Sequence, residues 1–341
     1  MKKHSTTIWS MNVKMANSGK KINYAIRPAK NIERKMFRDM LIRLFPFGIF
    51  SQYQYIGFGS KYFVDFTIIH KYLHINDMIS IESDIANQER YIFNKPYECI
   101  NVKFGRSTEV LPKLDLDKKT IIWLDYDDAF SNFMLEDIST LVSKLPSGSI
   151  ICMSYNSHPY QRIQLENEYT DISEGYYRTK FEEIFGEEHI PGNFSEQGWT
   201  NKTSFSKFIR NAVNSQITTV LSSRNNIEKP REQWINCKQI LYFDYADNAN
   251  MSTLCFALVS EKDKSMLTAC NLEELDFYRD STTSYEIKIP NLTSKEVRYL
   301  MEKMPNEGKI DLLKNIFNDN DVEEFKKNYR YYPSFTEIES F

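Results

Sequence analysis

The sequence has no apolar run of the roughly 20 residues that a membrane-spanning helix requires, and its first residues, Met-Lys-Lys-His-Ser-Thr-Thr, lack the apolar stretch of a signal peptide. We therefore expect a cytoplasmic protein without membrane contact. The five cysteines are scattered without the spacing of metal ligands, and four of them lie in or beside apolar, strand-like segments. This distribution is typical of reduced core thiols, so we expect neither a disulfide framework nor a metal site.

Several catalytic signatures are also missing. The chain contains no Gly-x-Ser-x-Gly elbow, no Gly-Lys-Ser/Thr phosphate loop and no metalloprotease helix. These absences argue against a serine hydrolase of the α/β-hydrolase type, a P-loop nucleotidase and a zinc protease. With 341 residues, of which 41% are hydrophobic and 14% aromatic, the chain can bury a full core, either as two average domains or as one domain with insertions.

The most informative segment is 53–60, Tyr-Gln-Tyr-Ile-Gly-Phe-Gly-Ser, which leads into a helical pattern. An apolar run that ends in Gly57-x-Gly59-Ser60 predicts a strand, a glycine turn and the start of a helix. Glycine lets the backbone approach a ligand closely, and the N–H groups at a helix start favour a polar or anionic group. The segment therefore indicates a nucleotide-cofactor turn, although it lacks the third glycine of a dinucleotide fingerprint. The alternative is a strand-to-helix turn without a ligand.

Strand and helix patterns alternate regularly after this turn. Four consecutive β-α units with apolar strands predict a parallel, doubly wound sheet that is covered on both faces. The predicted strands are 53–57, 78–82, 100–104, 120–125 and 149–155, and the predicted helices are 62–73, 85–93, 108–114 and 132–145.

The alternation stops after residue 156. Residues 157–206 are acidic and aromatic without a second sheet-sized pattern, so we interpret them as an inserted cap. A helix at 207–221 follows, and two strand-like runs, 239–245 and 253–259, are joined by a turn-rich connection that fits a hairpin. The expected fold is α/β, with a Rossmann-like sheet of seven strands that is mostly parallel and ends in an antiparallel hairpin.

The chain thus divides into three predicted parts. Residues 1–50 form a basic arm and an N-terminal helix, 51–260 form the α/β domain with its insert, and 261–341 form a helical extension. In the extension, Thr293 is a predicted N-cap for a helix that continues over 297–304. A second helix is expected at 322–329, and the aromatic segment after it is expected to pack on the body.

The first part has a strong excess of positive charge. Residues 1–50 hold eleven Lys and Arg against two acids, a local charge of +9, so the remainder carries −12. A helix is predicted at 29–44, directly after Arg27-Pro28, and Lys30, Arg34 and Arg38 lie opposite its apolar stripe. These side chains could bind nucleic acid or another anionic partner. A solvated basic face is the alternative, and Tyr24, Arg27 and Lys30 could also close over a cofactor.

Residues 52–260 resemble the class I S-adenosylmethionine-dependent methyltransferases, because five β-α units precede a hairpin, glycines follow the first strand and acids follow the second and fourth. The resemblance implies S-adenosylmethionine as cofactor. Gly57, Gly59 and Ser60 match the turn that cradles its methionine part, and Glu82 matches the acid that holds the ribose hydroxyls, a charge-assisted contact. Glu82 could instead cap the next helix. The resemblance also places Gly105, Arg106 and Ser107 at the adenine edge and Asp125 beside the methyl group.

Two departures from this pattern are informative. Tyr55 stands where the family usually has an acid, so the methionine amine needs another partner, and Asp65 or Asp125 are the candidates. The segment Asp125-Tyr-Asp127-Asp128 also differs from the Asp/Asn-Pro-Pro-aromatic motif of enzymes that methylate nucleobase amines. Three segments are also similar to those of a group of bacterial methyltransferase-like proteins, some of them suspected in defence against phage. The segments are Arg-Pro-Ala-Lys-x-Ile-Glu-Arg at 27–34, Gly-Phe-Gly-Ser at 57–60 and Trp-Leu-Asp-Tyr-Asp at 123–127.

Carboxylates gather at the end of the fourth predicted strand. Asp125, Asp127 and Asp128 could hold Mg²⁺ or supply a base, and the last two could instead cap the next helix. We take Asp125 and Asp127 as the candidate catalytic residues. His158, which follows the fifth strand, is either a general base or a histidine in a surface turn.

These observations favour a methyltransferase that acts on an oxygen or nitrogen of an acceptor held under the insert, by alignment of nucleophile and sulfonium. The competing hypothesis is a degenerate methyltransferase fold that senses a cofactor or nucleotide and recruits a protein or nucleic acid through its basic segment.

Overall fold

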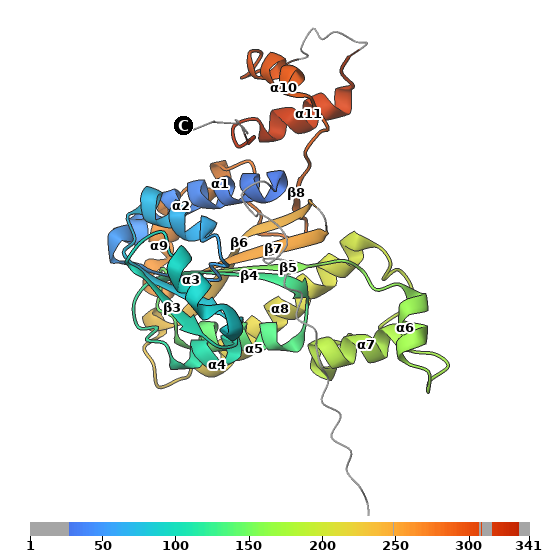
Figure 1. The fold of residues 1–341 in the computed structure, drawn as a ribbon. Coiled ribbons are helices and arrows are strands. Elements are labelled where there is room, and N and C mark those ends of the chain that lie inside the picture. The colour runs from blue at the N-terminus through green and yellow to red at the C-terminus, as the bar shows by residue number, and fades with distance from the viewer. Residues whose placement is uncertain (1–26, 248, 307, 309–315, 334–341) are drawn as a thin grey trace, which may run out of the picture.

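The structure is a computed structural model that describes residues 27–247, 249–306, 308 and 316–333 (Figure 1). The arm over residues 1–25, with Tyr24, and the end of the aromatic segment from Ser334 onward lie outside the described residues. Within the described ranges, no helix is long and apolar enough to cross a membrane.

One mixed sheet organises the molecule. Its strand order is β3-β2-β1-β4-β5-β7-β6-β8, in which the first five strands are parallel, β7 is antiparallel to β5 and β6, and β8 is parallel to β6. The strands are β1 Gln54–Gly57, β2 Asp77–Glu82, β3 Ile100–Phe104, β4 Thr120–Ala129, β5 Ile150–Asn156, β6 Ile235–Ala246, β7 Asn250–Ser260 and β8 Tyr285–Ile287. The expected α/β fold with an antiparallel hairpin is confirmed, and a short eighth strand extends the predicted seven.

Helices cover both faces of this sheet, as the uninterrupted apolar strands predict. One core lies under α1, α2 and α9, and the other lies under α5, α7 and α8. The helices are α1 Pro28–Arg43, α2 Val64–Leu73, α3 Gln88–Asn94, α4 Ser107–Val110, α5 Asn132–Lys144, α6 Arg162–Glu168, α7 Tyr176–Phe185, α8 Lys202–Arg224, α9 Lys264–Ala269, α10 Ser294–Met301 and α11 Asp319–Asn328.

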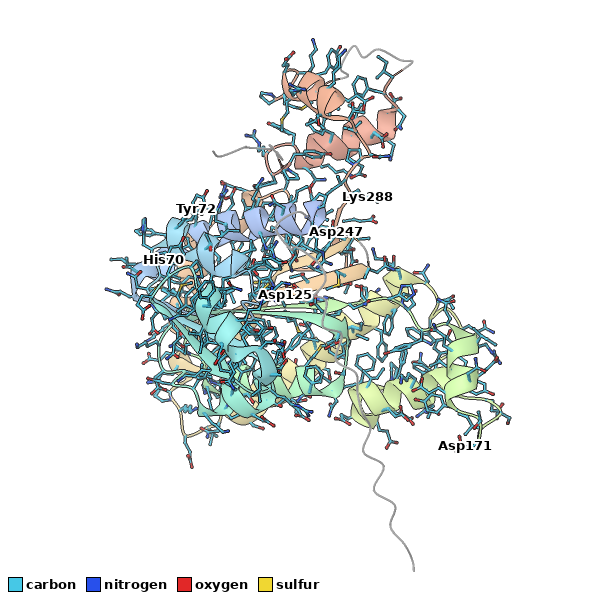
Figure 2. All side chains as sticks on the ribbon, viewed as in Figure 1. His70, Tyr72, Asp125, Asp171, Asp247 and Lys288 are labelled. Atoms are coloured by element: carbon cyan, nitrogen blue, oxygen red, sulfur yellow. The ribbon has the colours of Figure 1, made fainter. Side chains whose placement is uncertain are left out.

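Helix α1 begins at Pro28, one residue before the predicted start, and most of its apolar stripe is buried against the sheet. Its N-terminus is capped from a distance: the carboxylate of Asp247, in the turn between β6 and β7, accepts hydrogen bonds from the backbone N–H groups of Ala29 and Lys30 at 2.9 and 3.1 Å (Figure 2). The expectation that Lys30 and Arg34 face solvent is wrong, because these side chains are only 1% and 3% exposed. The helix is therefore buried on two sides.

The expected insert contains α6 and α7, and α8 already begins inside its predicted range. Its aromatic composition has a structural role, because the ring of Phe181 contacts a cluster of other aromatic rings. These rings belong to Phe185, Phe194, Trp199, Phe205 and Phe208.

The C-terminal helices form a small unit with its own core. Thr293 and Glu296 make the capping box that starts α10, as the sequence predicts. Polar contacts attach α11 to the sheet: the hydroxyl of Tyr285 donates to Asn328 Oδ1 at 3.3 Å, and Asn328 Nδ2 donates to the carbonyl of Lys288 at 3.0 Å.

Candidate functional site

The candidate site lies at the carboxyl edge of the parallel strands. Strand β1 has β2 on one side and β4 on the other, so the chain direction of the connections reverses there, which is where open α/β sheets bind ligands. Gly57 is level with Ser80 on β2 and with Trp123 on β4. Glu82 and Asp125 each lie two residues further along, so they flank the glycine turn from both sides.

The glycine turn is tightly packed. A Cβ atom at Gly59 would lie 2.5 Å from the ring of Phe63 and 2.8 Å from Ser80 Oγ, and the N–H of Gly59 donates to that hydroxyl at 3.0 Å. Ser60 and Phe63 have φ of 47° and 49°, and α2 begins only after them. Packing alone thus requires glycine at position 59, so this glycine is not evidence for a ligand by itself.

Glu82 is a buried carboxyl group directly beside this turn. Its Oε1 accepts a hydrogen bond from Ser80 Oγ at 2.8 Å, and the backbone N–H groups of Gly59 and Ser60 also donate to it. Burial raises the pKa of Glu82 to about 7, although these three donors act in the opposite direction. At neutral pH the group therefore exchanges between acid and carboxylate.

The third predicted segment follows β3. Gly105 has φ of 146°, a conformation that side chains disfavour, and its N–H donates to the carbonyl of Glu82 at 3.0 Å. Arg106 is exposed. Ser107 instead contacts the buried pair formed by Tyr126 and Asp137, whose hydroxyl-to-carboxylate distance is 2.6 Å. The structure thus brings Gly105 next to Glu82 and leaves its neighbour Arg106 accessible.

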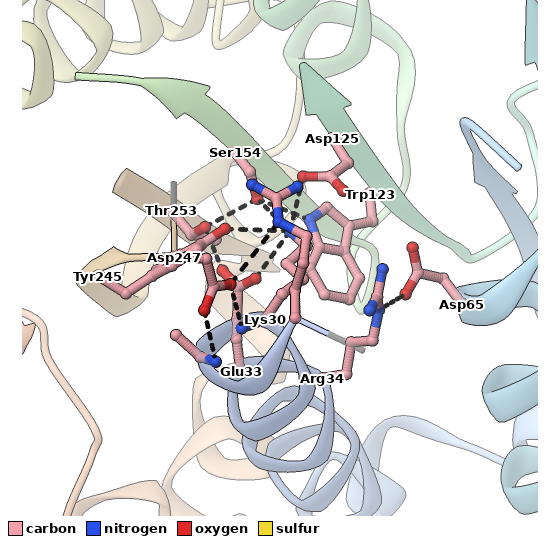
Figure 3. A network of polar contacts seen from close by, with 12 residues as sticks. Lys30, Glu33, Arg34, Asp65, Trp123, Asp125, Ser154, Tyr245, Asp247 and Thr253 are labelled. Atoms are coloured by element: carbon pink, nitrogen blue, oxygen red, sulfur yellow. Dashed lines mark hydrogen bonds and ion pairs between the residues drawn. The ribbon is translucent and has the colours of Figure 1, made fainter. Parts of the chain in front are cut away.

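Asp125 is held by a lysine that the sequence reasoning placed elsewhere (Figure 3). Lys30 Nζ, from α1, lies 2.6 Å from Asp125 Oδ1 and 2.7 Å from Glu33 Oε2. It also lies 4.5 Å from the centre of the Trp123 ring, a cation–π contact. Two carboxylates therefore share one buried ammonium group.

The ionisation of these groups follows from the geometry. Burial would raise the pKa of Asp125, but the ammonium of Lys30 and the more distant Arg34 outweigh it and hold the pKa below its usual value. Burial likewise would lower the pKa of Lys30, and the two carboxylates raise it well above its usual value. For Glu33 burial prevails, and its pKa is raised.

A wider network fixes this group in place. Trp123 Nε1 donates to Ser154 Oγ at 2.9 Å, Ser154 contacts Thr253 Oγ1 at 2.7 Å, and Thr253 donates to Glu33. Beside it, Arg34 Nε pairs with Asp65 Oδ1 at 2.5 Å. Asp65, one of the two candidates for the cofactor amine, is thus already occupied by an arginine.

The remaining predicted residues lie further along the same edge. Strand β4 continues to Ala129, and the N-cap residue of α5 is Ser131 rather than Asp127 or Asp128, contrary to one alternative. Both are half-buried. In the part of the chain that the structure describes, no group of three or more His, Cys, Asp or Glu side chains is arranged to hold a metal ion.

His158 is an exposed turn residue. Its backbone N–H donates to Asn156 Oδ1 at 2.8 Å, and its Nδ1 lies 3.3 Å from Asn250 Nδ2. These contacts favour the surface-turn interpretation. The sequence did not predict the roles of Glu33, which pairs with Lys30, and of Asp247, which caps α1. The signal available for Glu33 was an acid within the first turns of a mostly basic helix.

A comparison of the sequence with protein-family models gives a match over residues 22–340 to the family described as "Putative O-methyltransferase". The chain belongs to this family. The match extends beyond the α/β core, because it includes α1, the insert and the C-terminal helices. Among proteins of curated function, no sequence matches this chain.

Several solved structures, including the following three, have a similar arrangement. SAH-bound PaMTH1 of Podospora anserina is 10% identical, covers 59% of this chain and 70% of its own, and gives a TM-score of 0.27. TomG of Streptomyces achromogenes, in complex with SAM, is 10% identical, with coverages of 65% and 79% and a TM-score of 0.34. Trm1 of Pyrococcus horikoshii, with S-adenosyl-L-methionine, is 7% identical, with coverages of 68% and 57% and a TM-score of 0.39. Three further structures are matched over 43% to 55% of their own length.

Proposed function

We propose that this protein binds S-adenosylmethionine at the carboxyl ends of β1, β2 and β4 and transfers its methyl group to an oxygen or nitrogen of an acceptor. The observation that carries the proposal is Glu82, a buried carboxyl group beside the glycine turn at the point where the sheet reverses, in a chain of a methyltransferase family. A carboxylate at this position suits the two vicinal hydroxyls of a ribose.

The residues at this edge fit the cofactor chemically. Glu82 would accept the ribose hydroxyls, residues 57–60 would line the methionine part, and residues 105–107 would meet the adenine edge. Asp125, whose pKa is below its usual value, would bind the amine through the oxygen that Lys30 does not hold. Carboxyl groups outnumber cations at these strand ends, which suits a ligand that carries a sulfonium and an ammonium group.

The bound cofactor would supply an electrophilic methyl group, and the chain's own residues would orient the acceptor and take up its proton. Asp125 is a weak base because Lys30 stabilises its ionised form. We therefore assign orientation to Asp125 and proton uptake to Asp127, which is half-buried two residues further along β4.

Incubation of the protein with S-adenosylmethionine labelled in the methyl group, together with nucleic acid, protein and small-molecule fractions of a cell extract, tests this assignment. We expect label in one fraction. Asp125→Asn and Asp127→Asn should cut turnover far more than cofactor affinity, because their interactions matter most in the transition state. Glu89→Gln, an exposed acid on α3, is the matched control and should change neither. The similarity to bacterial proteins suspected in phage defence supports including phage nucleic acid among the fractions.

The second candidate function is a sensor that binds the cofactor without turnover. Tyr55 in place of the usual acid favours it, as does the ion pair that already occupies one oxygen of Asp125. Firm cofactor binding with no label in any fraction would support the sensor. Lys30 and Arg34 are buried, and Arg38, which is partly exposed, pairs with Asp39. Recruitment of nucleic acid would therefore need residues other than Lys30 and Arg34.

A further inference from the structure

A cavity of about 670 Å³ lies between the sheet and the C-terminal helices, where α11, β8, the first residues of α1 and the turn after β6 meet. Asp247 and Lys288, labelled in Figure 2, stand on two of its walls. This volume is within the range of small-molecule sites. Met251 pairs with both Tyr245 on β6 and Asn156 on β5, so the cavity opens at the same sheet edge as the candidate site, several strands away.

Most charged groups of the cavity wall are paired with each other. Arg27 lies 3.7 Å from Asp247, and Lys288 lies 2.7 Å from Glu286. Asp321 accepts a hydrogen bond from the side chain of Asn318 at the start of α11. The two ion pairs are neutralised within the wall, whereas Asp321 keeps its negative charge beside a neutral amide.

Glu324 on α11 is different. Its side chain is only 10% exposed, and one oxygen, Oε1, accepts from Lys327 Nζ at 3.0 Å. The other oxygen, Oε2, is buried without any hydrogen-bond partner among the described residues. A buried carboxylate oxygen without a donor is unfavourable, so a ligand that brought one would gain the energy that the protein lacks. Glu324 lines the cavity.

Lys202 provides the opposite charge. It is the first residue of α8 and lines the same cavity. Across the described ranges of the chain, its ammonium has neither an ion pair nor a hydrogen bond. The cavity therefore presents one unsatisfied carboxylate oxygen and one unpaired ammonium, carried by two different helices.

We propose that this cavity binds a small zwitterion, with the ligand's ammonium group on Glu324 and its carboxylate on Lys202. The site is separate from the cofactor site and does not rest on the proposed methyl transfer. Tyr245 connects the two regions, because it lines the cavity and its hydroxyl accepts from Lys30 Nζ at 3.3 Å. Tyr245 thus lies between the cavity and Lys30, the ion-pair partner of Asp125.

A titration of the full-length protein with ω-amino acids from glycine to 8-aminooctanoate, and with the matching alkylamines, tests the proposal. Calorimetry and thermal shift are both readouts, in the absence of S-adenosylmethionine. We expect saturable binding with an optimum chain length. Glu324→Gln should weaken binding of amino acids and amines alike by at least about tenfold, the effect of losing one charge-assisted hydrogen bond. Lys202→Gln should weaken the amino acids and leave the alkylamines unchanged.

Glu323→Gln is the control, because Glu323 is the exposed neighbour of Glu324 and pairs with Lys326 on the same helix. It should bind every probe as the parent protein does. Absence of binding by all probes at millimolar concentration, or binding that Glu324→Gln leaves unchanged while the variant melts like the parent protein, would overturn the proposal. If Glu324→Gln fails to fold, Lys202→Gln still decides: equal affinity for the amino acids in that variant and in the parent protein would refute the zwitterion site.

Discussion

Replacement of Lys30 by methionine removes the central cation of the buried network while keeping a side chain of similar length. In the parent protein the ammonium lies 2.6 Å from Asp125 and 2.7 Å from Glu33, and it is 1% exposed. Its removal leaves two carboxyl groups in a buried space without their common partner. Breaking a buried ion pair in this way costs about 3–5 kcal/mol, a large share of the 5–15 kcal/mol of a typical domain. We expect the free energy of unfolding to fall by this amount at pH 7.

The pH dependence identifies the cause. Because the pKa of Lys30 is raised in the folded protein, its contribution to stability is fully present below the pKa of the unfolded state. It is lost only as pH rises through the pKa of the folded state. Because the pKa of Asp125 is lowered in the folded protein, its contribution to stability is fully present above the pKa of the unfolded state. It is lost as pH falls through the pKa of the folded state. Both contributions are therefore complete at pH 7. In Lys30→Met the two carboxylates repel each other, so protonation at lower pH should shrink the deficit.

Urea unfolding followed by tryptophan fluorescence measures this effect, since Trp123 lies in the network. The double variant Lys30→Met/Glu33→Gln should recover part of the loss. Lys71→Met, an exposed lysine on α2, is the control and should stay within about 0.5 kcal/mol of the parent protein. A loss below about 1 kcal/mol at pH 7, or a deficit that grows as pH falls, would refute the described network.

Three further perturbations probe the surroundings of the site. Because the pKa of Glu82 is raised to about 7, the folded state binds more protons than the unfolded state between about pH 4.5 and 7. The free energy of unfolding of the cofactor-free protein should therefore fall by about 3 kcal/mol as pH rises across that window. Glu82→Gln should remove this slope in a pH series of urea midpoints. Asp247→Ala should lower the free energy of unfolding by about 1–2 kcal/mol, because α1 loses its cap. Asp280 is an exposed acid paired with Lys238, and Asp280→Ala should cost less than about 1 kcal/mol. Equal losses in the two variants would argue against the cap. Gly59→Ala should cost about 1–3 kcal/mol without any ligand, because its Cβ would meet the Phe63 ring, while Gly192→Ala, which meets no atom within 4 Å, should be neutral in the same melting assay.

The sequence was sufficient for the architecture because its signals are local. Apolar runs, glycine turns and the Thr293 cap each lie within a few residues, and they located the five parallel strands, the hairpin and the first tail helix. Strand β8 was missed because three residues give no periodicity. The extension of β4 to Ala129 was missed because its last residues are acidic, a composition that is typical of a loop.

The candidate site could be predicted only where it depends on strand ends. Glu82 and Asp125 follow apolar strands, so the topology alone brings them to one edge. The partners of Asp125 could not be found in this way, because Lys30 is 95 residues away and a lysine on an amphipathic helix is usually exposed. Its burial depends on acids from α1 and β4 that meet only in the folded molecule.

Cofactor binding tests the central claim most directly. Isothermal titration of the full-length protein with S-adenosylmethionine and with S-adenosylhomocysteine should show saturable binding with one molecule per chain. Glu82→Ala should weaken it by about 1.5–3 kcal/mol, the scale of hydrogen bonds to a charged group, and Glu89→Ala should leave it unchanged. An absence of heat and of any melting shift at saturating cofactor would contradict the account, as would binding that Glu82→Ala does not weaken.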